Sequence, residues 1–370
     1  MNIKSLLIGS AAALAAVSGA QAADAIVAAE PEPMEYVRVC DAFGTGYFYI
    51  PGTETCLQIS GYVRFQADFK QDGVTETRVN PVTGLLESRT DDGYKAFSRG
   101  YISLDAKSDT ELGTLTGHID IQADSDGSGV ELDGAWLQLG GFRAGWFYGY
   151  WDKGINGETD LNDSGFGAIY NAVSYTYEAG SFSASAALET FNQTDRADRL
   201  DPGGWANNGS FSKLSDDWGI SAQVSGAFGA VSADLLASYD FDAEEAAIRG
   251  LISADLGPGQ LQAFAVWASG ANRYWNASEW SIAASYKAQI NEKFSITPGA
   301  QYFGNLNPAG FGTDGTLDGD FLDDDGWKAG VTLDYEIVKD LTTKVSVQYE
   351  DLDTREDSNW SGFVRLQRSF

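Results

Sequence analysis

The sequence predicts an all-β fold: a transmembrane antiparallel β-barrel of 16 strands, with short turns at one end and long loops at the other. Two observations predict it. Apolar and polar residues alternate along segments of about eleven residues, which is long for a soluble strand and suits a tilted strand that crosses a membrane. The joints between these segments alternate between short and long, as in outer-membrane barrels, whose short turns are periplasmic.

Four segments show the alternation most clearly: 218–228, 231–241, 280–290 and 327–337. One face of each is free of polar and charged residues, while most of the interleaved residues are polar or charged. Because successive strand side chains point to opposite faces, each segment has one apolar face and one polar face. A soluble sandwich would alternate too. However, Trp and Tyr near the ends of the apolar faces suit a membrane boundary, and small residues in the middle would leave holes between packed sheets.

The same pattern extends along the whole mature chain. It predicts strands at 57–69, 98–108, 113–124, 130–140, 142–152, 172–179, 182–192, 217–228, 230–242, 245–256, 259–270, 278–290, 293–304, 326–338, 341–353 and 359–370. The longer loops are expected at 70–97, 153–171, 193–216, 271–277, 305–325 and 354–358. The last strand ends the chain at Phe370, which fits a strand that closes a barrel and leaves no open edge.

The N-terminus has the features of a secretory signal peptide. Lys4 precedes a short apolar run that ends in Ala-Gln-Ala at residues 20–22, the small-x-small pattern of a cleavage site. We therefore expect residues 1–22 to be a signal peptide and the mature chain to be exported from a bacterium.

An N-terminal segment, residues 23–56, is expected to precede the barrel of residues 57–370. It contains the two cysteines of the sequence, Cys40 and Cys56. In an exported chain this pair favours one disulfide that closes a loop. A zinc site, which would need more ligands than two cysteines and the single histidine, and two free thiols are the alternatives.

Seven basic residues fall on the inner face once the apolar face is assigned to lipid. They are Arg64, Arg143, Arg249, Lys287, Lys328, Lys344 and Arg365. A lipid-facing Arg or Lys at the bilayer midplane would cost ~2–4 kcal/mol, so these cations are predicted to face water. A water-filled interior wide enough for them fits sixteen strands, since about eight strands would be packed solid by side chains.

The loop at 153–171 follows the fifth predicted strand and carries Glu158, Asp160 and Asp163. If this loop folds inward, its carboxylates stand opposite some of the wall cations. A transverse field across a narrow eyelet would then orient and sieve small polar solutes. An ordinary solvated surface loop is the alternative, and the spacing alone leaves it open.

The composition argues against several other classes of protein. With Lys+Arg 24 and Asp+Glu 53, the net charge of -29 disfavours nucleic acid as a partner, because its phosphates need basic residues. His118 has no Ser or Asp at a recognisable spacing, and no metal-ligand cluster or phosphate loop is found, so we expect neither an enzyme nor a cofactor. The acidic stretch 314–326 resembles a calcium loop only loosely, because Leu322 stands where an oxygen ligand is needed.

Residues 37–69, VRVCDAFGTGYFYIPGTETCLQISGYVRFQADF, resemble the N-terminal signature of the general porins of alphaproteobacteria. The strand pattern and the terminal phenylalanine extend this similarity over the mature chain. The resemblance implies a sixteen-stranded homotrimer in the bacterial outer membrane, among its lipids and lipopolysaccharide, that passes small hydrophilic solutes and ions. It also implies that the loop at 153–171 folds into the lumen, with Glu158, Asp160 and Asp163 at the constriction.

The predicted function is therefore passive diffusion through a water-filled outer-membrane channel, with a lean toward cations. A substrate-selective channel, for example for sugars, is the alternative. Such a channel would need a continuous track of aromatic residues on the lumen face. The inward candidates for that track are Tyr62, Tyr101, Phe147 and Trp151.

Overall fold

A computed structural model describes most of the chain. The described residues are 38–71, 74–79, 86–91, 93–162, 168–191, 218–307, 321–355 and 357–370. Residues 39–370 form one compact unit. Among the described residues, no helix is both long and apolar enough to cross a membrane.

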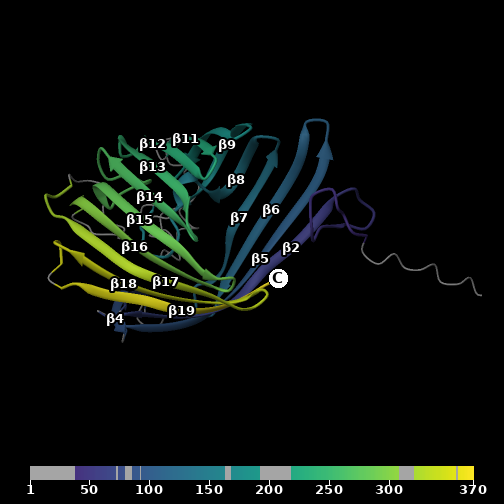
Figure 1. Ribbon diagram of the computed structural model, residues 1–370. Helices are drawn as coiled ribbons and strands as arrows, with labels where there is room; N and C mark the ends of the chain where they lie inside the picture. Colours follow the sequence, from purple (N-terminus) through teal and green to yellow (C-terminus); the bar gives the residue numbers. More distant parts are fainter. Residues whose placement is uncertain are drawn as a thin grey trace, which may run out of the picture. The chain divides into compact units, whose positions relative to one another are not determined.

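Within these residues, 16 strands form one antiparallel barrel (Figure 1). They are β2 (Cys56–Lys70), β5 (Tyr94–Thr110), β6 (Gly113–Asp124), β7 (Gly129–Leu139), β8 (Phe142–Tyr148), β9 (Ile169–Ala179), β10 (Phe182–Thr190), β11 (Trp218–Phe228), β12 (Val231–Asp240), β13 (Glu245–Leu256), β14 (Gly259–Ala268), β15 (Ser278–Asn291), β16 (Phe294–Leu306), β17 (Gly326–Val338), β18 (Leu341–Leu352) and β19 (Asn359–Ser369). Each strand pairs with the next along the chain. The predicted sixteen-stranded barrel is confirmed.

The barrel closes where its last strand meets its first. β19 pairs with β2 over the register from Ser361–Lys70 to Ser369–Tyr62. Beyond it, the backbone N–H groups of Gly61 and Phe370 each donate to the carbonyl of the other residue at 3.0 Å. The C-terminal residue therefore completes the closure, and the sheet hydrogen-bonds to itself all the way round.

Two-residue turns join the strands at one end of the barrel. Glycines begin several of them, and Gly180, Gly229 and Gly257 have φ angles of 63°, 66° and 58°. Asp340 takes the same left-handed conformation, with φ 64°, in the turn between β17 and β18. Such turns match the twist of the paired strands, and glycine adopts them without a steric penalty from Cβ.

The strand predicted at 142–152 is shorter in the structure. β8 ends at Tyr148, and residues Tyr150–Asp152 form a 3₁₀ turn. The N–H of Gly149 donates to the carbonyl of Ala168 at 2.6 Å, which closes the base of the following loop and directs the chain away from the sheet. The alternation of residue types continues past this point, so periodicity alone places the strand end too late.

Three short strands were not predicted. β3 (Val74–Val79) and β4 (Leu86–Asp91) pair as a separate hairpin within the first long loop. β1 (Phe48–Tyr49) pairs with the start of β2.

The N-terminal cysteines form a disulfide, Cys40–Cys56, as the exported context favours. Both are buried and pack with Tyr47, which is 5% exposed. The N–H of Cys40 donates to the carbonyl of Tyr47 at 2.9 Å. Because Cys56 is the first residue of β2, the bond ties this N-terminal loop to the barrel wall.

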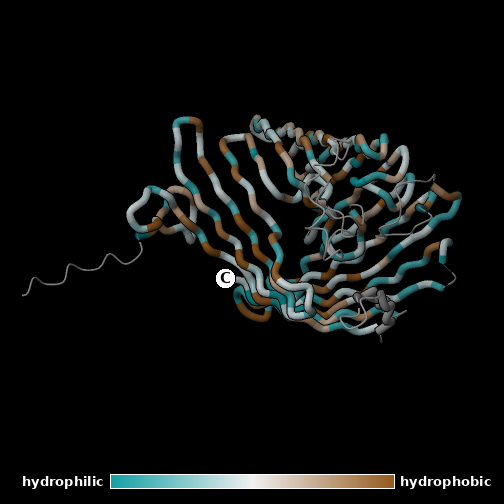
Figure 2. The backbone as a smooth tube through the Cα atoms, turned by 180° about the vertical axis from the view of Figure 1, so that it is seen from behind, coloured by the Kyte–Doolittle hydropathy of each residue, from teal (hydrophilic) through white to brown (hydrophobic). Residues whose placement is uncertain are grey.

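Hydrophobic and hydrophilic residues alternate along the strands (Figure 2). As this alternation predicts, the two faces of the strands meet different surroundings. On β2, Ile59, Val63 and Phe65 are 50%, 59% and 51% exposed on the outer face. Between them Arg64 is half-buried, and Gln66 is 8% exposed on the inner face. Exposed apolar and covered polar side chains are the reverse of a soluble protein and match a barrel in lipid.

A pair of neighbouring residues on β11 tests this assignment of faces. Val224 is 46% exposed on the outer face, and Gln223 is half-buried on the inner face. We expect Val224→Arg to lower the free energy of unfolding in lipid vesicles by ~2–4 kcal/mol. Gln223→Arg, the matched control, should change it by less than about 1 kcal/mol. Urea titration of the two variants measures the difference, and equal losses would contradict the assignment.

Candidate pore constriction

The loop between β8 and β9 lies against the inner face of the barrel. The N–H of Asn156 donates to Oε1 of Gln262 on β14 at 2.6 Å. The side-chain amide of Gln301 on β16 bonds both the N–H and the carbonyl of Leu161, at 2.6 and 2.9 Å. Both glutamines share the inner face of their strands, so the loop runs along the wall inside the barrel.

Arg249 on β13 joins the start of this loop to Asn162 within it. Its guanidinium donates to the carbonyls of Tyr150, Trp151 and Asn162 at 2.7, 3.0 and 3.1 Å, and it lies 4.9 Å from the centre of the Trp151 ring. Arg249 is only 2% exposed. The sequence predicts a cation facing water, whereas here it is covered by the loop and supports it.

Glu158 is the loop carboxylate that meets the wall cations. Its Oε1 lies 2.6 Å from Nζ of Lys344 on β18 and 3.8 Å from Nη1 of Arg365 on β19. All three side chains remain partly exposed, at 27%, 28% and 18%. Lys344 also lies 3.6 Å from Asp334, and Arg365 donates to Gln66 at 2.6 Å. These contacts form a cluster of positive and negative side chains where the loop meets the inner wall.

The other two predicted loop carboxylates have different positions. Asp160 accepts the N–H of Ile155 at 3.1 Å, inside the loop itself. Burial raises the pKa of Asp160, while this hydrogen bond and the charges of Lys328 and Arg249 oppose that rise. Asp160 therefore stabilises the loop from within. Asp163 lies outside the described residues.

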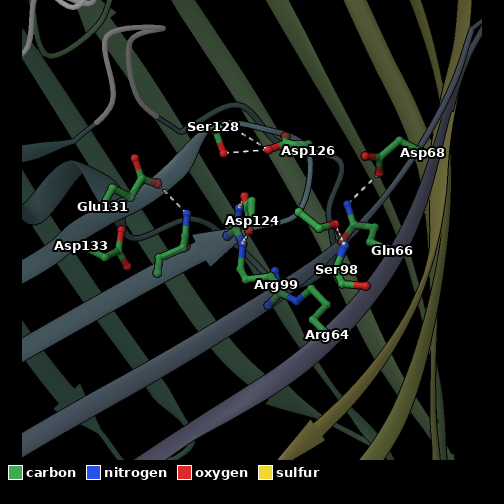
Figure 3. A network of polar contacts seen from close by, with 12 residues as sticks. Arg64, Gln66, Asp68, Ser98, Arg99, Asp124, Asp126, Ser128, Glu131 and Asp133 are labelled. Atoms are coloured by element: carbon green, nitrogen blue, oxygen red, sulfur yellow. Dashed lines mark hydrogen bonds and ion pairs between the residues drawn. The ribbon is translucent and has the colours of Figure 1, made fainter.

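Lys344 on β18 and Arg365 on β19 begin a row of cations on the inner wall, which continues with two arginines, Arg64 and Arg99. They are directly opposite each other on β2 and β5, and Figure 3 shows their side chains next to each other. Arg64 donates to Gln367 at 2.9 Å, and Arg99 makes two bonds of 2.7 Å to Asp124. The register therefore brings these arginines beside Arg365, which pairs with a neighbouring position of β2.

Sequence reasoning missed Arg99. Its neighbours are Ser98 and Gly100, so no large apolar residue beside it marks its inner-face position. Counting positions along β5 from Ile102 and Leu104, which are outward, would have found it.

Acidic residues of the wall were missed for another reason, since only cations were sought. Parity places three such residues on the inner face, because each lies between two apolar neighbours that face outward: Asp120, Asp234 and Asp334. Asp234 pairs with Lys153 at the start of the loop. The inner wall thus carries both signs of charge.

Lys287 and Lys328 are paired with polar residues of the neighbouring strands. Lys287 is opposite Gln260 on β14, and it is half-buried. Lys328 is opposite Gln301 on β16 and Glu350 on β18. Neither touches Glu158 within hydrogen-bonding distance among the described contacts.

The remaining predicted cation, Arg143, belongs to a group on β5, β6, β7 and β8. Its guanidinium lies 4.5 Å from the centre of the Trp136 ring, which stacks on His118 at 4.5 Å. The two ring nitrogens of His118 lie 2.9 Å from Asp105 and 2.7 Å from Asp120. The histidine is therefore clamped between carboxylates in the wall.

A cavity of about 330 Å³ lies beside Glu158. Its lining combines apolar surface with the charged and amide side chains of Asp68, Lys95, Lys328 and Gln348. Charged and amide groups around such a space suit water and small polar solutes.

A second connection, between β14 and β15, also packs inside the barrel. Its residues Tyr274 and Trp275 are fully buried, with ring centres 6.3 and 6.5 Å from that of Trp151. Because Trp151 is itself fully buried, it cannot contribute to an aromatic track for solutes. Tyr62 and Tyr101 do lie on the inner face and stack on each other at 4.9 Å.

Comparison with known proteins decides the family. The sequence profile of the porin subfamily matches residues 24–366. The chain belongs to the porins. An outer membrane protein of Sinorhizobium fredii is 49% identical over 381 residues, covering 100% of this chain and 99% of that protein. Porin Omp2b of Brucella suis is 34% identical over 416 residues and is matched along the full length of both chains.

The solved structures agree in fold. The outer membrane channel DcaP of Acinetobacter baumannii superposes with a TM-score of 0.61 at 14% identity, covering 87% of this chain and 99% of that one. This porin is an outer-membrane channel for passive diffusion, and its family relationship indicates a channel and not an enzyme.

The support that Arg249 gives to the loop can be measured. Arg249→Lys keeps the charge but loses the fork that reaches three carbonyls. We expect it to lower the free energy of unfolding in lipid vesicles by about 2–3 kcal/mol. The matched control is Arg143→Lys, which leaves the loop contacts intact and should cost about 1 kcal/mol or less. A smaller effect for Arg249→Lys than for the control would contradict the anchoring role.

Proposed function

We propose that the narrowest, charge-selective point of this porin lies where Glu158 faces Lys344 and Arg365. The observation that carries the proposal is the pair of contacts from one loop carboxylate to two wall cations, at 2.6 and 3.8 Å. A carboxylate beside a row of cations creates a field across the path of a solute. That field orients polar solutes and favours those that can exchange water for these groups.

Close contact between the loop and the wall supports a fixed constriction. Gly157 has φ +96°, and a Cβ there would come within 3.1 Å of the Thr297 side chain. A Cβ on Gly299 of β16 would come within 3.0 Å of the Thr159 hydroxyl. Both glycines therefore allow the loop tip to approach the wall, which holds Glu158 near its partners.

The remaining parts of the proposal concern selectivity and assembly. We expect a modest preference for cations, because Glu158 lies in the proposed constriction and the carboxylates of Asp120, Asp234 and Asp334 lie on the inner wall. We also propose that three barrels associate into a homotrimer among outer-membrane lipids and lipopolysaccharide. The apolar outer face, with exposed Trp218, Trp280 and Trp327 at strand ends, is suited to lipid and to a neighbouring barrel.

Reconstitution into planar lipid bilayers tests the channel directly. We expect stable, stepwise increases in conductance as the purified protein inserts, with current proportional to salt concentration. Flux that saturates and is blocked by one solute would instead indicate a substrate-selective channel. Conductance steps absent from correctly folded protein would refute the proposal.

Removing the charge of Glu158 tests the constriction. Glu158→Gln keeps the shape of the side chain but leaves Lys344 and Arg365 without their carboxylate. At separations of about 8 Å in water, one charge changes the ratio of cation to anion permeability by about twofold, here toward anions. Reversal potentials in a salt gradient measure this ratio.

The control for this variant is Glu111→Gln. Glu111 is an exposed residue of the turn between β5 and β6, so the same charge is removed outside the proposed constriction. Its reversal potential should match that of the wild type. Equal shifts in the two variants would mean that net charge, and not the position of Glu158, sets the selectivity.

A further inference from the structure

A buried carboxylate near the end of β10, Glu189, has no obvious part in the channel wall. Its side chain is 1% exposed. Its Oε2 accepts the hydroxyl of Ser221 at 2.7 Å and that of Tyr274 at 2.5 Å. Within the described part of the chain, no Lys or Arg lies within ion-pairing distance of it. Burying a carboxylate with only hydroxyl donors is unfavourable, so its presence calls for a physical reason.

Glu189 starts two chains of hydrogen bonds, or arms. The first arm leads to the loop between β8 and β9, which carries Glu158. Ser221 gives its proton to Glu189, so Ser238 must donate to Ser221 across their 2.8 Å contact. Ser238 in turn accepts the indole N–H of Trp151 at 2.9 Å. Every bond therefore points toward Glu189, and hydrogen bonds that polarise one another in this way strengthen each other. The carboxylate is the final acceptor that orients the whole chain.

The other arm leads to the connection between β14 and β15. Tyr274 reaches Glu189 only because position 219 on β11 is glycine: a Cβ there would stand 2.3 Å from the tyrosine hydroxyl. Tyr274 also packs edge-on against Tyr170 and Phe191, at 6.0 and 5.5 Å. The same carboxylate oxygen of Glu189 thus holds both the β14–β15 connection and, through Ser221, the β8–β9 loop.

We propose that Glu189 is a positioning residue for the pore: it holds two inward-folded loops, at Trp151 and at Tyr274, and so sets the open cross-section beside them. The proposal rests on the constriction described under the proposed function. A network that served only the stability of the wall would join strand to strand. This one ends at both extremities on residues of the loops that occupy the interior.

Single-channel recording of matched variants tests the proposal. Glu189→Leu keeps the volume and removes the acceptor oxygens, whereas Glu189→Gln retains one oxygen that can accept both hydroxyls. Losing the acceptor should raise the population of displaced loops about fivefold, seen as a matching rise in open-channel current variance. Glu189→Gln should restore the wild-type variance. Tyr274→Phe and Ser221→Ala, which each break one arm, should give smaller rises.

Controls separate the role of Glu189 from general effects. Glu178→Leu removes an exposed carboxylate from the opposite end of the neighbouring strand β9 and should leave the variance unchanged. The shift in gel mobility on heating shows that each variant is folded, and if Glu189→Leu does not fold, the two single-arm variants decide.

The outcomes are distinct. Wild-type variance in Glu189→Leu, Tyr274→Phe and Ser221→Ala would overturn the proposal. So would an equal rise in Glu178→Leu, or no rescue by Glu189→Gln. Absence of conductance in the wild-type protein would instead contradict the proposed constriction and the channel function on which it rests.

Discussion

The closed hydrogen-bonded sheet is the constraint on which the rest of this structure depends. Hydrocarbon offers no partner to a backbone N–H or carbonyl, so each strand must bond to a neighbour on both sides. Closure through β19, β2 and the terminal Phe370 meets that requirement. Once the sheet is closed, alternate side chains must face lipid or the interior, and the chemistry of every wall position follows from its parity.

The interior created by closure is too wide for the wall side chains to fill, and this is what makes a channel. Two loops occupy part of it. Arg249 and Gln301 fasten the first loop through its backbone groups, and Tyr274 anchors the second. Because these contacts are made to backbone carbonyls and buried polar groups, they constrain the loops without placing charge in the remaining path. The partly exposed charges, such as Glu158, can then act on solutes.

The candidate site could be read from the sequence only in part. Parity predicts an inner-face position for Lys344 and Arg365: Val345 lies beside Lys344, and Val364 and Leu366 flank Arg365. The pairing of Glu158 with both of them, and the retreat of Asp160 into the loop, depend on how the loop folds. The contacts of Glu158 join residues that are 186 positions apart (to Lys344) and 207 positions apart (to Arg365, 365 minus 158), and no local pattern encodes them.

By itself, the sequence determined the class of fold, the number of barrel strands and the sidedness of each strand. These follow from period-two alternation and composition, which are local properties. Only the tertiary structure decided which groups lie together inside the barrel: the row from Lys344 to Arg99, the burial of Arg249 and Trp151, and the seat of two loops on Glu189. The reason is that strand register and loop docking depend on contacts between distant segments, which exist only after the barrel has closed.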